Sequence, residues 1–163
     1  MTDTPVTGTP ALARIVVGVD GSEPSKRALA WSRFMALATG AVIEAISVWH
    51  VPVAPVIVGT GLPADPELRA ATGRLLHDTV TGVLGDTPDV PVRERVAHGT
   101  PARILIDAGE NAQLLVVGSR GHGGFTGLLL GSVSSACAEH AQCPVLVIHG
   151  DTPPPPAAAT PRP

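Results

Sequence analysis

The chain has 163 residues, 44% of them hydrophobic and 15% charged, with a formal net charge of −3. This length allows one domain with a hydrophobic core of its own. The slight acidic excess and the scarcity of aromatic residues disfavour a nucleic-acid-binding protein, which needs basic patches and base-stacking rings. No apolar stretch reaches the roughly 18 residues of a membrane span, and the N-terminus lacks the layout of a signal peptide. We therefore expect a cytoplasmic protein without a membrane partner.

The two ends of the chain differ in composition from the middle. Residues 1–12 are polar and contain prolines, which predicts a flexible lead-in. Residues 150–163 are rich in proline and alanine, so we expect a disordered or polyproline-like tail. Such a tail could dock on a proline-binding module, although a passive tail is the commoner fate of this composition. The folded domain is expected to span residues 13–149.

The chain begins with a strand–helix–strand pattern. A short apolar run at residues 14–19 predicts the first strand. Ser22 is a candidate N-cap for the following helix, because Pro24 suits a first helical turn. We expect this helix to cover residues 25–40, where it ends at a glycine. The second strand covers residues 41–50.

The middle of the chain contains two helices with a strand between them. The proline-containing segment after the second strand is too irregular to assign. Residues 65–84 carry apolar side chains at three- and four-residue steps and end before a glycine, which predicts a helix. Residues 91–98 have the alternating pattern of a half-exposed strand. Thr100 and Pro101 then form an N-cap and first-turn pair for the next helix.

The last third of the chain repeats the alternation. Residues 114–118 form an uninterrupted apolar run, which indicates a strand buried on both faces. A glycine-rich loop, a short helix at residues 132–141 and a last strand at residues 144–148 follow. Strands and helices alternate at a spacing that requires parallel strands with crossover helices. The expected fold is an α/β, doubly wound, open five-stranded parallel sheet with helices on both faces, a Rossmann-like architecture.

Two segments with the chemistry of a binding site follow predicted strands. Asp20 comes directly after the first strand, and the glycine-rich loop leads from the fourth strand to Ser132. In an open doubly wound sheet, ligands bind beyond the carboxyl ends of the strands, where the strand order reverses. If the first and fourth strands are neighbours, both segments meet in one crevice.

The chemistry of these segments favours a nucleotide. The amides of a glycine loop and of a helix start attract phosphate, and the Asp20 carboxylate suits ribose hydroxyls or a hydrated magnesium ion. The alternative is a crossover loop whose glycines serve only for turns. A P-loop is excluded because Lys26 is the only lysine of the chain. A dinucleotide fingerprint needs G-x-G-x-x-G after the first strand, where this chain reads VDGSEP. Gly121 and Gly123 begin such a pattern in the later glycine loop, but Thr126 stands where its third glycine would fall.

Cys137, His140 and Cys143 lie close together in the sequence. Structural zinc usually needs four ligands at recognised spacings, so packing of the cysteines in the core is the favoured interpretation. Two cysteines do not form a disulfide framework.

The glycine loop contains the motif G-x2-G-x9-G-[ST], which Gly118, Gly121, Gly131 and Ser132 satisfy. Together with the opening IVVGVDGSEPS and the closing CPVLVI, this motif resembles the nucleotide-binding branch of the universal stress protein family. The resemblance covers roughly residues 13–149. It implies a strand order of 3-2-1-4-5 and a homodimer that binds ATP, or in some cases AMP or ADP, with Asp20 as a candidate magnesium contact.

The resemblance also implies which residues contact the nucleotide, while the 50–64 loop has no counterpart that would indicate an adenine lid. The implied contacts are Gly18, Val19 and Asp20 on the adenosine side, Val48 at adenine, Gly118, Ser119, Arg120 and Gly121 around the ribose and phosphates, and Gly131, Ser132, Val133 and Ser134 at the phosphate tail.

The last strand is apolar on both faces, which makes it an aggregation hazard if it lies at an uncovered edge. Pairing with its copy across a two-fold axis would cover it. We therefore expect a homodimer through Val145, Leu146, Val147 and Ile148.

Two functions of different classes remain open. The first is an ATP-binding stress-response protein that acts as a nucleotide-dependent sensor or regulator. The second is a slow ATPase, a phosphotransferase or an adenylyl-transfer enzyme that uses the same site. Phosphoryl transfer needs positioned cations and a group that orients the nucleophile, whereas this site offers Asp20 and Arg120, with His122 as a further candidate base. We therefore expect binding without turnover and assign no catalytic residue.

Overall fold

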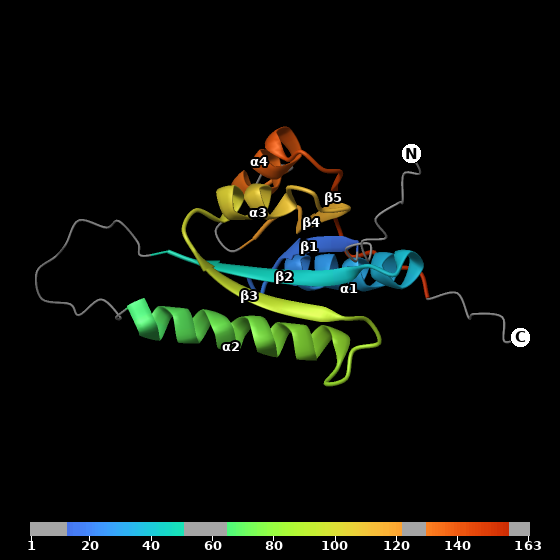
Figure 1. Ribbon diagram of the computed structural model, residues 1–163, viewed down its shortest axis with the longest axis horizontal. Helices are drawn as coiled ribbons and strands as arrows, with labels where there is room; N and C mark the ends of the chain where they lie inside the picture. Colours follow the sequence, from blue (N-terminus) through green and yellow to red (C-terminus); the bar gives the residue numbers. More distant parts are fainter. Residues whose placement is uncertain (1–12, 51–64, 122–129, 157–163) are drawn as a thin grey trace, which may run out of the picture.

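The computed structural model describes residues 13–50, 65–121 and 130–156. It contains a five-stranded parallel sheet in which the strands lie in the order β3-β2-β1-β4-β5. This arrangement confirms the expected fold class and strand order (Figure 1). The strands are β1 (Arg14–Gly18), β2 (Val42–Trp49), β3 (Val92–His98), β4 (Leu114–Gly118) and β5 (Val145–Ile148).

The helices cover both faces of the sheet. α1 and α2 contact each other on one face, and α3 and α4 contact each other on the opposite face (Figure 1). None of the helices in the described ranges is long and apolar enough to cross a membrane. The helices are α1 (Glu23–Thr39), α2 (Asp65–Leu84), α3 (Pro101–Gly109) and α4 (Ser132–His140).

The predicted start and end signals of α1 are confirmed. The Ser22 side chain accepts a hydrogen bond from the backbone N–H of Ser25, which makes Ser22 the N-cap. At the other end, Gly40 has a φ of 71° and donates its N–H to the carbonyl of Ala36, so the left-handed position falls on a glycine. Thr100 occupies the N-cap position of α3, but its side chain makes no capping hydrogen bond, contrary to expectation.

The hydrophobic core lies in two layers, one on each face of the sheet. Successive residues of a strand point to opposite faces, so the uninterrupted apolar runs of β1 and β4 supply both layers. The layer under α1 and α2 includes Ile15, Val17, Leu29, Ile43 and Leu76. The layer under α3 and α4 includes Val16, Ile46, Leu105, Leu115 and Cys137.

The segment after β5 turns back onto α1. Gly150 has a φ of 63°, and the next residue, Asp151, forms an ion pair with Arg27 at 2.9 Å. The indole Nε1–H of Trp31 donates to the carbonyl oxygen of Thr152 at 3.2 Å. The first residues of the proline-rich tail therefore lie against the second and third turns of α1.

Candidate functional site

A cleft of about 610 Å³ opens at the carboxyl ends of the central strands. β1 and β4 are hydrogen-bonded neighbours, so the turn after β1 and the loop after β4 meet there, as the sequence predicted. All but one of the nucleotide contacts that the resemblance implied lie on the wall of this cleft. These are Gly18, Val19, Asp20, Val48, Gly118, Arg120, Gly121, Gly131, Ser132, Val133 and Ser134.

The turn between β1 and α1 fixes the Asp20 carboxylate. Asp20 Oδ1 accepts the backbone N–H of Ser22 at 3.0 Å and the Ser22 hydroxyl at 2.5 Å. The same hydroxyl caps α1 by accepting the N–H of Ser25. Asp20 Oδ2 faces Gly121 so closely that a Cβ at position 121 would overlap it. The carboxylate therefore spans the cleft from the β1 turn to the glycine loop.

The glycines of the motif are required for different reasons. A Cβ at Gly118 would lie 2.7 Å from Pro24 Cβ and 2.8 Å from the Pro24 carbonyl carbon, closer than folded chains allow. Gly118 is therefore needed for the packing of β4 against the first turn of α1. Gly121 leaves room for the Asp20 carboxylate.

Gly131 is the exception, because no neighbour in the described structure requires it to be glycine. The nearest atoms to a Cβ there, Arg120 Cα and the Ser119 carbonyl oxygen, would be 3.5 Å away, and its φ of −75° suits any residue. Gly131 is the N-cap of α4, and its carbonyl accepts the first helical hydrogen bond from Ser135 N–H. The amides of the first turn have no acceptor within the helix and point outward with the positive end of the dipole. A bare backbone here permits close approach of an anion.

Ser119 differs from the expectation that it wraps the ribose and phosphates. It is 8% exposed and does not line the cleft. Its N–H donates to the carbonyl of Ile148 at 2.9 Å, and its own carbonyl accepts from Gly131 N–H at 2.7 Å. The motif places Ser119 beside the site, but the backbone of this residue connects β4, β5 and α4 instead.

The floor of the cleft is apolar, and the sequence predicted little of it. Ile46, Leu105 and Val117 are buried, and Pro101 and Leu75 complete the lining. Leu75 is 39% exposed although it belongs to the apolar stripe of α2. These residues come from four different elements, so a local sequence motif could not have identified them. The apolar patterns of these elements were visible, but the patterns did not show which residues reach the cleft.

The charged and titratable side chains on the described part of the wall are Asp20, His50 and Arg120. His50 follows β2, and no motif in the sequence distinguishes it from the other histidines of the chain. Lys26 does not line the cleft but forms an ion pair with Glu23 at 2.6 Å. The described wall therefore carries one carboxylate and one guanidinium, and the α4 N-terminus adds to its positive potential.

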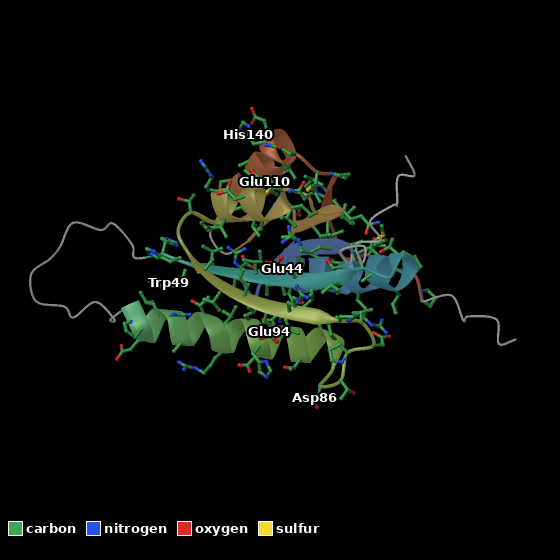
Figure 2. The ribbon with its side chains drawn as sticks, viewed as in Figure 1. Glu44, Trp49, Asp86, Glu94, Glu110 and His140 are labelled. Atoms are coloured by element: carbon green, nitrogen blue, oxygen red, sulfur yellow. The ribbon has the colours of Figure 1, made fainter. Side chains whose placement is uncertain are left out.

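A second and more open hollow of about 640 Å³ lies between α2 and β3. It is lined by Arg69, Gly73 and Val96 together with Trp49, which lies at the carboxyl end of β2 (Figure 2). The Trp49 ring also packs on His98, with 4.3 Å between the ring centroids. None of the motif residues contributes to this hollow.

The cysteines lie in the core layer under α3 and α4. Cys137 is fully buried, and burial together with the nearby Cys143 raises the pKa of its thiol to about 11. Burial also raises the pKa of Cys143. Among the described residues, no group of three or more histidine, cysteine or acidic side chains could hold a metal ion. Cys137 packs in this core layer, the environment that the sequence favoured for it.

Some predictions fall on parts of the chain outside the described ranges. The prediction that His122 is a candidate base is one of these, because His122 lies outside the described residues. Most of the 50–64 loop, which has no family counterpart, also lies outside the described residues, from residue 51 to residue 64. The homodimer and the magnesium contact also stay predictions.

Comparison with known proteins identifies similar sequences and structures. The model of the universal stress protein family matches residues 12–149. A universal stress protein of Mycolicibacterium smegmatis is 41% identical over 137 residues, which cover 82% of this chain and 45% of that protein. The chain thus spans about half the length of the curated relatives it matches.

Solved structures agree with the fold. A universal stress protein from Lactobacillus plantarum has a TM-score of 0.69 at 22% identity, covering 84% of this chain and 97% of that one. A universal stress protein solved in complex with cAMP has a TM-score of 0.60 at 28% identity, covering 85% and 98%.

Proposed function

Because the chain belongs to the universal stress protein family, we propose that its cleft at the ends of β1 and β4 binds an adenine nucleotide. The carrying observation is that the N-terminus of α4 lies on the cleft wall, with Gly131 at the N-cap and the exposed Ser132 as the first helical residue. An open helix start with a glycine at the N-cap is suited to phosphate.

The rest of the cleft fits the other parts of a nucleotide. The apolar floor formed by Ile46, Leu105 and Val117 is suited to a purine ring, and Asp20 is placed to meet ribose hydroxyls. The structural neighbour in complex with cAMP supports an adenine nucleotide. We propose ATP with magnesium as the ligand, with AMP and ADP as alternatives. Asp20 is the carboxylate that the metal would meet, and magnesium would neutralise part of the phosphate charge.

We further propose that the nucleotide is sensed rather than consumed. Arg120 is the one guanidinium on the described wall, and the single lysine of the chain is paired with Glu23 away from the cleft. Phosphoryl transfer relies on several positioned cations. Phosphate release in a single-turnover assay, at a rate above the uncatalysed one, would favour the ATPase alternative.

Gly131→Ala is expected to weaken ATP binding at least tenfold, which corresponds to about 1.4 kcal/mol. The added methyl group meets no described protein atom closer than 3.5 Å, so the free energy of unfolding should fall only by the modest cost of alanine at a helix N-cap, about 1 kcal/mol. Gly131 lines the cleft, so the added methyl group would narrow the space through which an anion approaches the start of α4. Isothermal titration calorimetry with ATP and AMP measures the affinity, and a thermal melt measures the stability.

Gly82→Ala is the matched control for that variant. Gly82 lies in α2, and no atom of the described residues lies within 4 Å of its Cβ position, so alanine should preserve affinity and strengthen the helix. If Gly131→Ala binds ATP as tightly as the parent protein, the phosphates do not lie at the α4 N-terminus. If the parent protein binds no adenine nucleotide, the proposed function is wrong.

We also propose that two copies pair through β5. This strand is at the edge of the described sheet, and three of its four residues are only half-buried. Pairing would bury its apolar side chains and satisfy its open hydrogen-bonding groups. Sedimentation at tens of micromolar, a concentration suited to a modest interface, should show twice the 16.6 kDa mass of one chain. A single species of 16.6 kDa would contradict the pairing.

A further inference from the structure

Ser134 directs its hydroxyl toward its own chain. It is the third residue of α4 and is 2% exposed, although it belongs to the cleft wall. Its Oγ lies 2.9 Å from the carbonyl oxygen of Ser119 and 3.0 Å from that of Gly131. A hydroxyl has one proton to donate, and both nearby oxygens can only accept it. The Ser134 hydroxyl is thus committed to the backbone of the loop.

The backbone of Ser119 connects separate parts of the chain through its hydrogen bonds, and we call this set of bonds the Ser119 joint. The Ser119 carbonyl accepts both the Ser134 hydroxyl and the Gly131 N–H, at 2.9 and 2.7 Å. On its other side, the N–H of Ser119 donates to the carbonyl of Ile148, the last residue of β5. The end of β4, the start of α4 and the end of β5 therefore meet at one buried residue.

We propose that Ser134 is a positioning residue rather than a nucleotide contact, and that the Ser119 joint it holds transmits nucleotide occupancy from the α4 N-terminus to β5. The inference rests on the proposed function, because it takes the first turn of α4 as the place where phosphate binds. It assigns a route by which binding alters the sheet edge at β5.

The direction of the effect follows from the geometry. A phosphate held by the first-turn amides of α4 restricts the motion of that turn. Gly131 and Ser134 both donate to Ser119, so the restriction reaches this carbonyl. Ser119 is fixed to Ile148 on its other side, so opening of the β4–β5 end becomes less frequent. Without the Ser134 hydroxyl, the Gly131 amide is left as the remaining described donor to this carbonyl.

Hydrogen exchange with and without saturating ATP tests the proposal. In the parent protein, ATP should slow exchange several-fold in a peptide that covers residues 145–149. Ser134→Ala should bind ATP about tenfold more weakly, and at saturating ATP its β5 peptide should exchange as fast as without ligand. Ser134→Thr keeps the hydroxyl and should restore both affinity and protection. Ser135→Ala, one residue further on an exposed position, should behave like the parent protein.

The outcomes separate this inference from the proposed function. ATP binding measured by calorimetry without a change at residues 145–149 in the parent protein overturns the transmission and leaves the nucleotide site standing. A Ser134→Ala variant that retains parent affinity and parent protection overturns the positioning role. Absence of any nucleotide binding by the parent protein overturns the proposed function and this inference together. The parent comparison needs no substitution, so it holds even if Ser134→Ala fails to fold.

Discussion

Replacing Gly118 with alanine is expected to lower the free energy of unfolding by about 3 kcal/mol, at the upper end of overpacking effects. The new Cβ would lie 2.7 to 2.9 Å from three atoms of Pro24, two of which belong to the backbone. A flexible side chain could move aside, but Pro24 is held in the first turn of α1. Either β4 or α1 must shift, and both contribute to the cleft.

Urea denaturation of Gly118→Ala beside Gly131→Ala measures this effect. Both substitutions add one methyl group within the same motif, but only the first brings it within 3 Å of described backbone atoms, at 2.8 and 2.9 Å, whereas the second stays at ordinary contact distance, 3.5 Å. A difference in stability of less than about 0.5 kcal/mol between them, within the ordinary range for neutral substitutions, would contradict the packing argument. The result also bears on ATP binding. If Gly118→Ala is this unstable, a loss of ATP affinity in that variant comes from a disturbed fold rather than from a lost phosphate contact.

Leu105→Ala is expected to lower the free energy of unfolding by about 3 kcal/mol, because it leaves a cavity where a buried leucine side chain was. Leu105 is 3% exposed and joins α3 to the core layer above the sheet. It also forms part of the cleft floor, so the affinity for an adenine nucleotide should fall with the stability. Chemical denaturation and calorimetry on the same preparation separate the two effects.

A second substitution tests whether Leu105 and Gly18 share one space. A Cβ at Gly18 would be 2.8 Å from Leu105 Cδ1, the far end of a side chain. Gly18→Ala should therefore be destabilising alone but should fill part of the cavity left by Leu105→Ala. The loss in free energy of unfolding in the double variant should be about 1 kcal/mol smaller than the sum of the two single losses. Strict additivity would show that the two positions do not interact.

The location of the cleft that forms the candidate site could be predicted from the sequence, because it depends on where the strands end. Asp20 and the Gly118 loop each follow an apolar run, and parallel strands place their carboxyl ends at one edge. Neither segment had to be seen in three dimensions for the crevice to be inferred. The apolar floor could not be predicted in this way, because Leu75 and Leu105 reach the cleft from helices on opposite faces.

The roles of individual motif residues were also beyond the sequence. Ser132 and Ser134 are the same residue type two positions apart, yet Ser132 is exposed and Ser134 is buried against Ser119. Gly118 and Gly131 fit one motif, yet Pro24 requires only the first. A spacing gives residue types along the chain, whereas these differences arise from contacts between distant segments.

The contact between the C-terminal segment and α1 can be followed by tryptophan fluorescence. The chain has two tryptophans and no tyrosine, so its near-ultraviolet emission comes from Trp31 and Trp49. Trp31 donates its indole N–H to Thr152, while Trp49 lies at the far end of β2 (Figure 2). Replacing Trp49 with phenylalanine would leave Trp31 as the single tryptophan. Its emission would report whether the segment at Thr152 is bound to α1 or detached from it.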